Sequence, residues 1–200
     1  MGRKSVSRKR KPVTNKVNLW LRDLLICLQK EDIEQLTIDD MARLAGKSKS
    51  TIYEYFESKE EILMVACQTW TRVLSESILN KSQQNLNTIK LYEHLVEIFA
   101  EGTADISISF LQSVKLHYPK AWSVIEEFTD AFVDLLKMQY KQGIAEEIYN
   151  PISVDLLGQI DKLFVTQVVT DPAFFTDKKY TLSNLIRDYL NLRLTGLLKR

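Results

Sequence analysis

The sequence predicts an all-α protein, and three observations lead to this fold class. Apolar residues recur at spacings of three and four along most of the chain, and no segment shows the alternation typical of a strand. The 200 residues include only 6 Gly and 4 Pro, too few for the many tight turns of a β-sandwich or barrel. Hydrophobic residues make up 45% and charged residues 26%, as in an ordinary globular protein. We expect an N-terminal three-helix domain with a helix-turn-helix and a C-terminal helical domain.

The charge is distributed unevenly along the chain. Residues 1–16 contain seven Lys or Arg and no acid, whereas the remaining residues carry 20 bases and 26 acids. Residues 1–13 are therefore expected to form a basic flexible arm that favours phosphates or anionic lipid head groups. A solvated tail that aids solubility is the alternative interpretation.

The elements of the N-terminal half follow from apolar spacing and capping residues. A first helix is expected over about 14–29. Thr37 is a good N-cap for a short helix over 38–44, and Gly46 supplies the left-handed backbone of a sharp turn. Ser48 then caps a second short helix that reaches residue 55 or 56, and Ser58 caps a long helix from Lys59 to about residue 81.

Two short helices joined by a tight glycine turn are typical of a helix-turn-helix, whose second helix enters the DNA major groove. Ala42 is small enough for a close helix crossing, and Ile52 and Phe56 are expected to face the core. The rest of the second helix carries polar side chains that can reach phosphates and base edges. The alternative is a helical hairpin with no role in DNA binding.

The residues from Leu36 to Leu63 resemble the DNA-binding domain of TetR-family transcriptional regulators. The shared motifs are a small residue followed by glycine at the turn, then Thr-Ile-Tyr, Tyr-Phe and Ser-Lys-Glu, in order and without a gap. The resemblance implies a DNA-binding domain over 14–63 and a helical effector-binding and dimerisation domain over 64–200.

The resemblance also implies roles for individual positions. Lys49 and Ser50 fall where the family reads bases, while Thr51, Tyr53, Tyr55 and Lys59 fall where its members grip phosphates. Tyr55 is equally acceptable as a core aromatic. The full set of expected DNA-binding residues is Thr37, Lys47, Ser48, Lys49, Ser50, Thr51, Tyr53, Tyr55 and Lys59.

One residue departs from the family pattern. Lys47 occupies a turn position where the family usually has Val. Either its aliphatic stem packs while its ammonium reaches solvent or phosphate, or the turn is less well anchored than usual.

Further helices are expected over 89–102, 106–117, 121–142, 154–169 and 182–198, with Pro119, Pro151 and Pro172 in the connections. This half is rich in aromatic residues, which can simply fill a core. The resemblance implies that some of them line a cavity for a small, largely apolar ligand. The candidates are Phe99, Phe110, Tyr118, Trp122, Phe128, Phe132 and Phe164.

The last two helices resemble the pair through which the family dimerises. Apolar residues repeat there at spacings of three and four and need a partner surface. The expected interface residues are Leu157, Ile160, Phe164, Leu185, Tyr189 and Leu192. A two-fold dimer would present two recognition helices about one DNA turn apart, so the operator is expected to be a palindrome.

These patterns predict a cytoplasmic, homodimeric transcription regulator, a repressor released by a small-molecule effector. A DNA-binding dimer without effector, whose C-terminal domain docks a protein partner, is the alternative. A helical enzyme is a remote third hypothesis, because the chain lacks the catalytic motifs of a glycine-rich loop, a GxSxG elbow and an HExxH pair. Glu93, His94 and Glu97 form only a weak metal constellation, so no metal and no cofactor is expected. The two cysteines, Cys27 and Cys67, are expected to be reduced and buried, and no apolar segment is long enough to span a membrane.

Overall fold

The computed structural model describes residues 10–82, 86–171 and 180–199. Within these residues the helices are α1 (Asn15–Leu28), α2 (Ile38–Leu44), α3 (Lys49–Tyr55), α4 (Lys59–Ser82), α5 (Thr88–Gly102), α6 (Ile108–His117), α7 (Pro119–Ala145), α8 (Val154–Leu163) and α9 (Leu182–Leu197). A π-helical turn, η1 (Phe164–Val168), directly continues α8. The described residues thus have the predicted all-α fold, and every expected helix is present.

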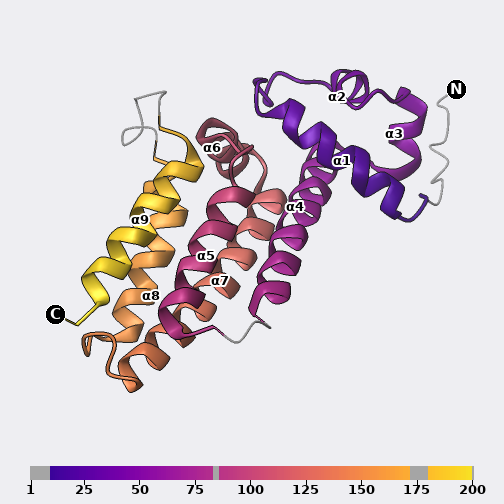
Figure 1. Cartoon of the computed structure of the whole chain (residues 1–200). Helices are drawn as coiled ribbons and strands as arrows, with labels where there is room; N and C mark the ends of the chain where they lie inside the picture. Colours follow the sequence, from indigo (N-terminus) through magenta and orange to yellow (C-terminus); the bar gives the residue numbers. More distant parts are fainter. Residues whose placement is uncertain (1–9, 83–85, 172–179, 200) are drawn as a thin grey trace, which may run out of the picture.

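The helices form two groups joined by α4. Figure 1 shows α1, α2 and α3 around one end of α4, and we call this group the N-terminal domain. The C-terminal bundle consists of α5 to α9 and the rest of α4. Within it α4 packs on α7, α5 packs on α9, and α7 packs on α8. The α8–α9 pair therefore lies on the side of the bundle remote from the N-terminal domain (Figure 1).

Three expected boundaries need correction. Pro119 begins α7 instead of lying in a connection, because a proline at the first helical position gives up an N–H that would be unpaired anyway. The helix expected from residue 106 begins at Ile108, because the Ser107 hydroxyl accepts the N–H of Phe110 as its N-cap. The single helix expected over 154–169 changes to π-helical geometry at Phe164. Pro172 lies outside the described residues.

Polar contacts connect the two groups of helices near the ends of α1 and α6. The Ser107 N–H donates to Gln29 Oε1 over 2.9 Å, which joins the end of α1 to the start of α6. The Tyr118 hydroxyl donates to the carbonyl of Ile33 over 3.1 Å from the end of α6. Both ends of α6 are therefore bonded to residues of the segment between α1 and α2.

Two further sequence predictions concern membranes and thiols. Among the described helices, none combines the length and the apolar character needed to cross a lipid bilayer. Both cysteines are free thiols, as expected, but only Cys67 is fully buried, whereas Cys27 is half-buried. Burial raises the pKa of the Cys67 thiol to about 12, which keeps it protonated and unreactive at neutral pH.

Candidate nucleic-acid interface

The turn between α2 and α3 is a complete Schellman motif. Gly46 has a φ of 61°, as the sequence predicts, and its N–H donates to the carbonyl of Arg43 over 3.0 Å. The N–H of Lys47 donates to the carbonyl of Ala42 over 2.8 Å. These two bonds pair the last carbonyls of α2 and set the direction of α3.

The buried face of α3 anchors it to the N-terminal domain. Ile52 is fully buried and Phe56, which ends the helix, is 1% exposed. The Phe56 ring meets Trp20 of α1 edge to face, with ring centroids 5.9 Å apart. Ala42 is buried where α2 passes these residues. The prediction that Ile52 and Phe56 face the core is therefore confirmed, and α3 is held as a rigid element.

The opposite face of α3 is polar and open to solvent. Ser48, Lys49 and Ser50 are exposed, and Tyr53 is 41% exposed. The Ser48 hydroxyl caps α3 by accepting the N–H of Thr51, and it also lies within hydrogen-bond distance of the Ser50 and Thr51 hydroxyls. Small hydroxyls of this kind bond either to each other or to an incoming phosphate or base edge.

Ion pairs on this face are short but solvated. The Lys49 ammonium lies 2.7 Å from the Asp39 carboxylate of α2, and both side chains are more than half exposed. The hydrogen bond to Asp39 raises the pKa of Lys49. Since exposed pairs are weak, Lys49 can leave Asp39 for a nucleic-acid acceptor at little cost.

The end of the basic arm lies against α3. Lys11 pairs with Glu54 over 2.7 Å and its backbone N–H donates to the Glu54 carbonyl. Arg10 pairs with Glu57 over 3.0 Å and donates to the carbonyl of Tyr53. The arm therefore neutralises two carboxylates that would otherwise repel a phosphate backbone.

Two lysines near the turn have opposite surroundings. Lys47 is half-buried, consistent with a packed stem, and its ammonium has no hydrogen bond or ion pair within the described residues. The Lys59 ammonium instead donates to three backbone carbonyls, those of Ile33, Glu34 and Leu36, at 2.8 to 3.0 Å. With all three N–H groups used, Lys59 has no donor left for a phosphate, so we correct its expected role to a structural one.

The other expected contacts differ in exposure. Thr37 is exposed, but its hydroxyl donates to Asp40 and accepts the Asp40 N–H in a capping box. Tyr55 is half-buried and packs against the core beside Phe56, so its ring belongs mainly to the domain interior. Thr51 is half-buried at the first turn of α3. The face of α3 that is open to solvent therefore carries Ser48, Lys49, Ser50 and Tyr53, with the half-buried Lys47 at the turn before it.

The aromatic residues expected to line a ligand cavity mostly pack against one another. The Phe99 ring stacks on Phe128 and on Phe132, with ring centroids 5.7 Å and 4.1 Å apart. Phe110 and Trp122 are 3% and 7% exposed. Only about 20 Å³ remains open beside Phe99, Phe132 and Phe164, roughly enough for one water molecule. Three of the seven predicted residues thus line a space that is small in this structure, and their contact with a ligand stays a prediction.

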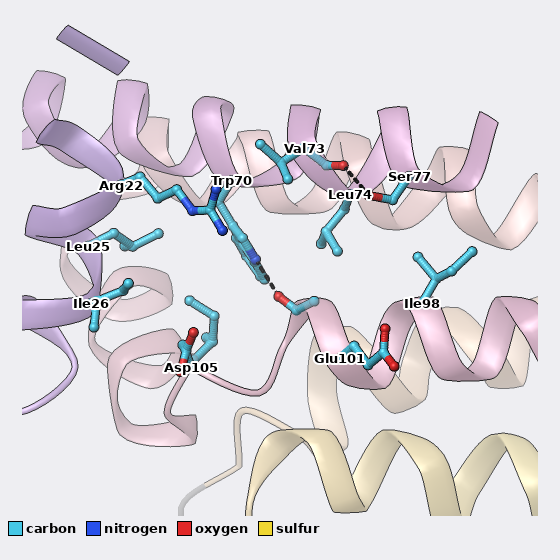
Figure 2. A pocket seen from close by; sticks show the side chains of 12 residues that line it. Arg22, Leu25, Ile26, Trp70, Val73, Leu74, Ser77, Ile98, Glu101 and Asp105 are labelled. Carbon is cyan, nitrogen blue, oxygen red and sulfur yellow. Dashed lines mark hydrogen bonds between the residues drawn. The ribbon is translucent and has the colours of Figure 1, made fainter. Parts of the chain in front are cut away.

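A much larger cavity, of about 400 Å³, lies between the N-terminal domain and the C-terminal bundle. Its lining includes none of the seven predicted ligand residues (Figure 2). The residues are Arg22, Leu25, Ile26, Trp70, Val73, Leu74, Ser77, Ile98, Glu101, Gly102, Asp105 and Ile106. We call this space the interdomain cavity. Trp70 of α4 is the one aromatic residue in this lining.

The α8–α9 pair exposes an apolar surface. We define the α8–α9 face by its exposed apolar residues, which are Leu156, Ile160, Leu163 and Leu192, at 55%, 39%, 53% and 73% exposure. Ile160 and Leu192 were expected there, whereas Leu156 and Leu163 were not. Leu157 and Leu185 are only 3% and 8% exposed, so most of each side chain packs inside the protein, and their contact with a partner stays a prediction.

Behind this face lies a buried network of charge. The Asp161 side chain is almost fully buried and accepts hydrogen bonds from Tyr140 over 2.8 Å and Tyr189 over 2.6 Å. Arg193 pairs with it over 2.8 Å. Burial opposes the charge on Arg193, but the adjacent carboxylate prevails and raises the pKa of the guanidinium. Tyr189, predicted as a contact residue, also stacks on Phe164, with ring centroids 3.7 Å apart, and thus orders α9 against η1.

Comparisons with known proteins agree with this geometry. Residues 25–65 match the family model described as bacterial regulatory proteins of the tetR family, a range that contains α2, the turn and α3. The HTH-type transcriptional regulator YvaF of Bacillus subtilis is 20% identical over 167 residues, which cover 80% of this chain and 85% of that protein.

Solved structures share the fold over nearly the whole chain. The fatty acid degradation regulator FadR from Bacillus halodurans has a TM-score of 0.69 at 22% identity, covering 95% of this chain and 100% of that one. A transcriptional regulator from Saccharomonospora viridis in complex with choline has a TM-score of 0.71 at 17% identity, covering 94% of this chain and 100% of that one. The fold and the exposed face of α3 are those of a helix-turn-helix transcriptional regulator. Through residues 25–65 the chain is similar to the TetR family of bacterial regulatory proteins.

Proposed function

We propose that the chain is a homodimeric repressor that binds a palindromic operator through α3 and is released by a small, largely apolar ligand. The observation that carries this proposal is the open polar face of α3 on a helix-turn-helix whose other face is fixed by Ile52 and Phe56. A rigid helix with exposed hydrogen-bonding side chains is what major-groove recognition requires.

The proposed DNA contacts divide into two kinds. Lys49 and Ser50 lie at the start of α3 and read base edges, because their side chains are exposed and their present partners are other surface groups. Lys47 and Tyr53 hold phosphates, since the Lys47 ammonium is unpaired within the described residues and the Tyr53 ring is partly open to solvent. Arg10 and Lys11 offset the negative charges of Glu57 and Glu54 beside the end of α3.

The proposed dimer forms through the α8–α9 face. A monomer in water would leave Leu156, Leu163 and Leu192 more than half exposed on neighbouring helices. Contiguous apolar surface of this kind marks an interaction site, and two copies related by a two-fold axis cover it isologously. Two α3 helices about one DNA turn apart then match two half-sites.

Ligand control is supported by the interdomain cavity. Its volume of about 400 Å³ falls within the range of small-molecule sites, and most of its lining is apolar. The similar Saccharomonospora viridis regulator holds choline, so this fold accommodates small molecules. A ligand that favours one spacing of the two α3 helices over another changes DNA affinity by the same factor by which DNA changes ligand affinity.

The test is selection of binding sites from random DNA at about 150 mM salt, where nonspecific phosphate attraction is already weakened. Full-length protein is compared with a variant that lacks residues 1–12. A palindromic consensus selected by the full-length protein supports a dimeric regulator, and a reporter gene behind that site should be less active when the protein is present. If no sequence is enriched, sequence-specific regulation is wrong. If the reporter is more active, the protein activates instead of repressing.

A further inference from the structure

The interdomain cavity is shared between the part of the protein that carries α3 and the part that carries the α8–α9 face. Its lining comes from α1, α4, α5 and the connection between α5 and α6 (Figure 2). Whatever fills it touches α1 directly. A ligand in the cavity would therefore contact the N-terminal domain directly through the lining residues of α1.

The apolar part of the cavity is well ordered. Leu25, Leu74, Ile98 and Ile106 are each 5% exposed or less and form a continuous apolar wall. The Trp70 indole N–H donates to the carbonyl of Gly102 over 2.8 Å, which holds the ring at the cavity (Figure 2). A half-buried indole fixed by its N–H loses little side-chain entropy when a ligand binds beside it.

Gly102 packs against α4 at the end of α5. A Cβ added at Gly102 would lie 1.8 Å from Leu74 Cδ2, so a larger residue there would require the Leu74 side chain to move. The Gly102 carbonyl lies within reach of Trp70 and ties the indole to the end of α5.

The charges around the cavity are unequal. Glu101 and Asp105 contribute two carboxylates from the end of α5 and the following connection, and Arg22 contributes one guanidinium from α1 (Figure 2). None of the three forms a hydrogen bond or ion pair within the described residues. Arg187 lies near Glu101 but pairs with Glu97 over 2.8 Å. The lining therefore carries two carboxylates against one guanidinium, and Arg187 adds a more distant charge interaction with Glu101.

We propose that the interdomain cavity binds a small organic cation, an apolar body that carries one ammonium group. The apolar body packs on Leu25, Ile98 and Ile106, and the ammonium lies between the Trp70 ring and the carboxylates of Glu101 and Asp105. Indole faces attract ammonium groups, and two unpaired carboxylates favour a cation over an anion. This inference rests on the proposed function, since it assigns the chemical class and the site of the releasing ligand.

The test uses three probes with one shared ring, titrated calorimetrically into the full-length protein. The probes are the cation benzyltrimethylammonium, its neutral isostere neopentylbenzene and the anion 3-phenylpropionate. We expect the cation to bind about tenfold more tightly than the neutral isostere and the anion to bind more weakly still. The inference is overturned if the anion binds most tightly, if charge makes no difference, or if no probe binds.

Variants locate the site. Changing Glu101→Gln together with Asp105→Asn should weaken binding of the cation about tenfold, while Val73→Trp should abolish it by filling the cavity. Glu126→Gln with Asp134→Asn removes two exposed carboxylates from α7 and is the matched control for net charge. Equal affinity in the wild type and in both cavity variants places the site elsewhere. The Glu101/Asp105 variant changes only exposed side chains, so it decides the matter even if the Val73 variant fails to fold.

The operator selection described above separates this inference from the proposed function. A protein that selects a palindrome but binds no cation keeps its function and loses this ligand site. A protein that binds the cation in the cavity but selects no DNA sequence keeps the site and loses the function.

Discussion

The N-terminal domain and the α8–α9 region hold their charges in opposite ways. In the N-terminal domain Lys49 pairs with Asp39 and Lys11 with Glu54 on the solvated surface. In the α8–α9 region Asp161 and Arg193 are paired almost out of reach of water, with two tyrosine hydroxyls on the same carboxylate. Exposed pairs exchange partners easily, whereas a buried pair is lost only at high cost. The N-terminal domain thus has ion pairs that can change partners, whereas the α8–α9 region has a pair that stays fixed.

The largest expected effect tests the fixed region. Asp161→Asn should lower the free energy of unfolding by about 3–5 kcal/mol, because it leaves the Arg193 guanidinium buried without a counter-charge. Urea titration followed by circular dichroism measures this change. Asp155→Asn is the matched control, since Asp155 pairs with Lys137 over 2.7 Å but is exposed, and it should barely move the midpoint. If both variants lost similar free energies of unfolding, the buried pair would be no more important for stability than the exposed pair.

The next effect tests the rigidity of the N-terminal domain. Gly46→Ala should lower the free energy of unfolding by about 1–2 kcal/mol, because a Cβ is unfavourable at a φ of 61°. Gly196→Ala is the matched control: both sites have open space for a Cβ, but Gly196 lies in α9 with ordinary helical backbone. We expect that variant to be unchanged or stabilised by up to about 1 kcal/mol. If both variants lost the same free energy of unfolding, the cost of Gly46→Ala would not come from the positive φ of Gly46.

A smaller effect concerns the cap of α2. Thr37→Ala should lower the free energy of unfolding by about 1 kcal/mol, measured by thermal unfolding at neutral pH. Hydrogen bonds from the Thr37 side chain and backbone lower the pKa of Asp40 below its ordinary value of 3.8. The part of the stabilisation that comes from the Asp40 carboxylate is therefore present above about pH 4 and is lost as the pH falls through the lowered pKa, whereas the bond from the Asp40 N–H to the Thr37 hydroxyl remains. A difference between wild type and variant that persists undiminished at still lower pH would contradict this account.

The smallest effect distinguishes the two lysines near the turn. Lys47→Ala should weaken binding to all DNA sequences and reduce the slope of log affinity against log salt by about one phosphate contact, with little change in stability. Lys59→Ala should leave that slope unchanged and lower the melting temperature, because three carbonyls lose their donor. Binding measured by fluorescence anisotropy at several salt concentrations decides between the two roles. If only Lys59→Ala reduced the salt slope, Lys59 would be the phosphate contact and Lys47 would not.

The sequence predicted the helices far better than the sites. Capping residues and apolar spacing located α2 and α3 to the residue, because Thr37, Gly46 and Ser48 act on their immediate neighbours in the chain. The role of Lys59 could not be predicted in the same way, because its acceptors come from a segment about 25 residues earlier. Nor could spacing show whether Phe99 and Phe132 enclose a space or stack, since both arrangements use the same helix faces.

The π-helical turn η1 changes the direction of the side chains that follow α8. Its closing bond joins the N–H of Val169 to the carbonyl of Phe164, five residues apart instead of four. One additional residue enters this turn, so side chains after it point about 100° away from the positions that the spacing of Leu157 and Ile160 would give. The carbonyl of Thr166 in the same turn accepts from the Lys115 ammonium over 2.6 Å, which ties α6 to it. The α8–α9 face therefore ends at Leu163, and Val169 turns into the core at 1% exposure.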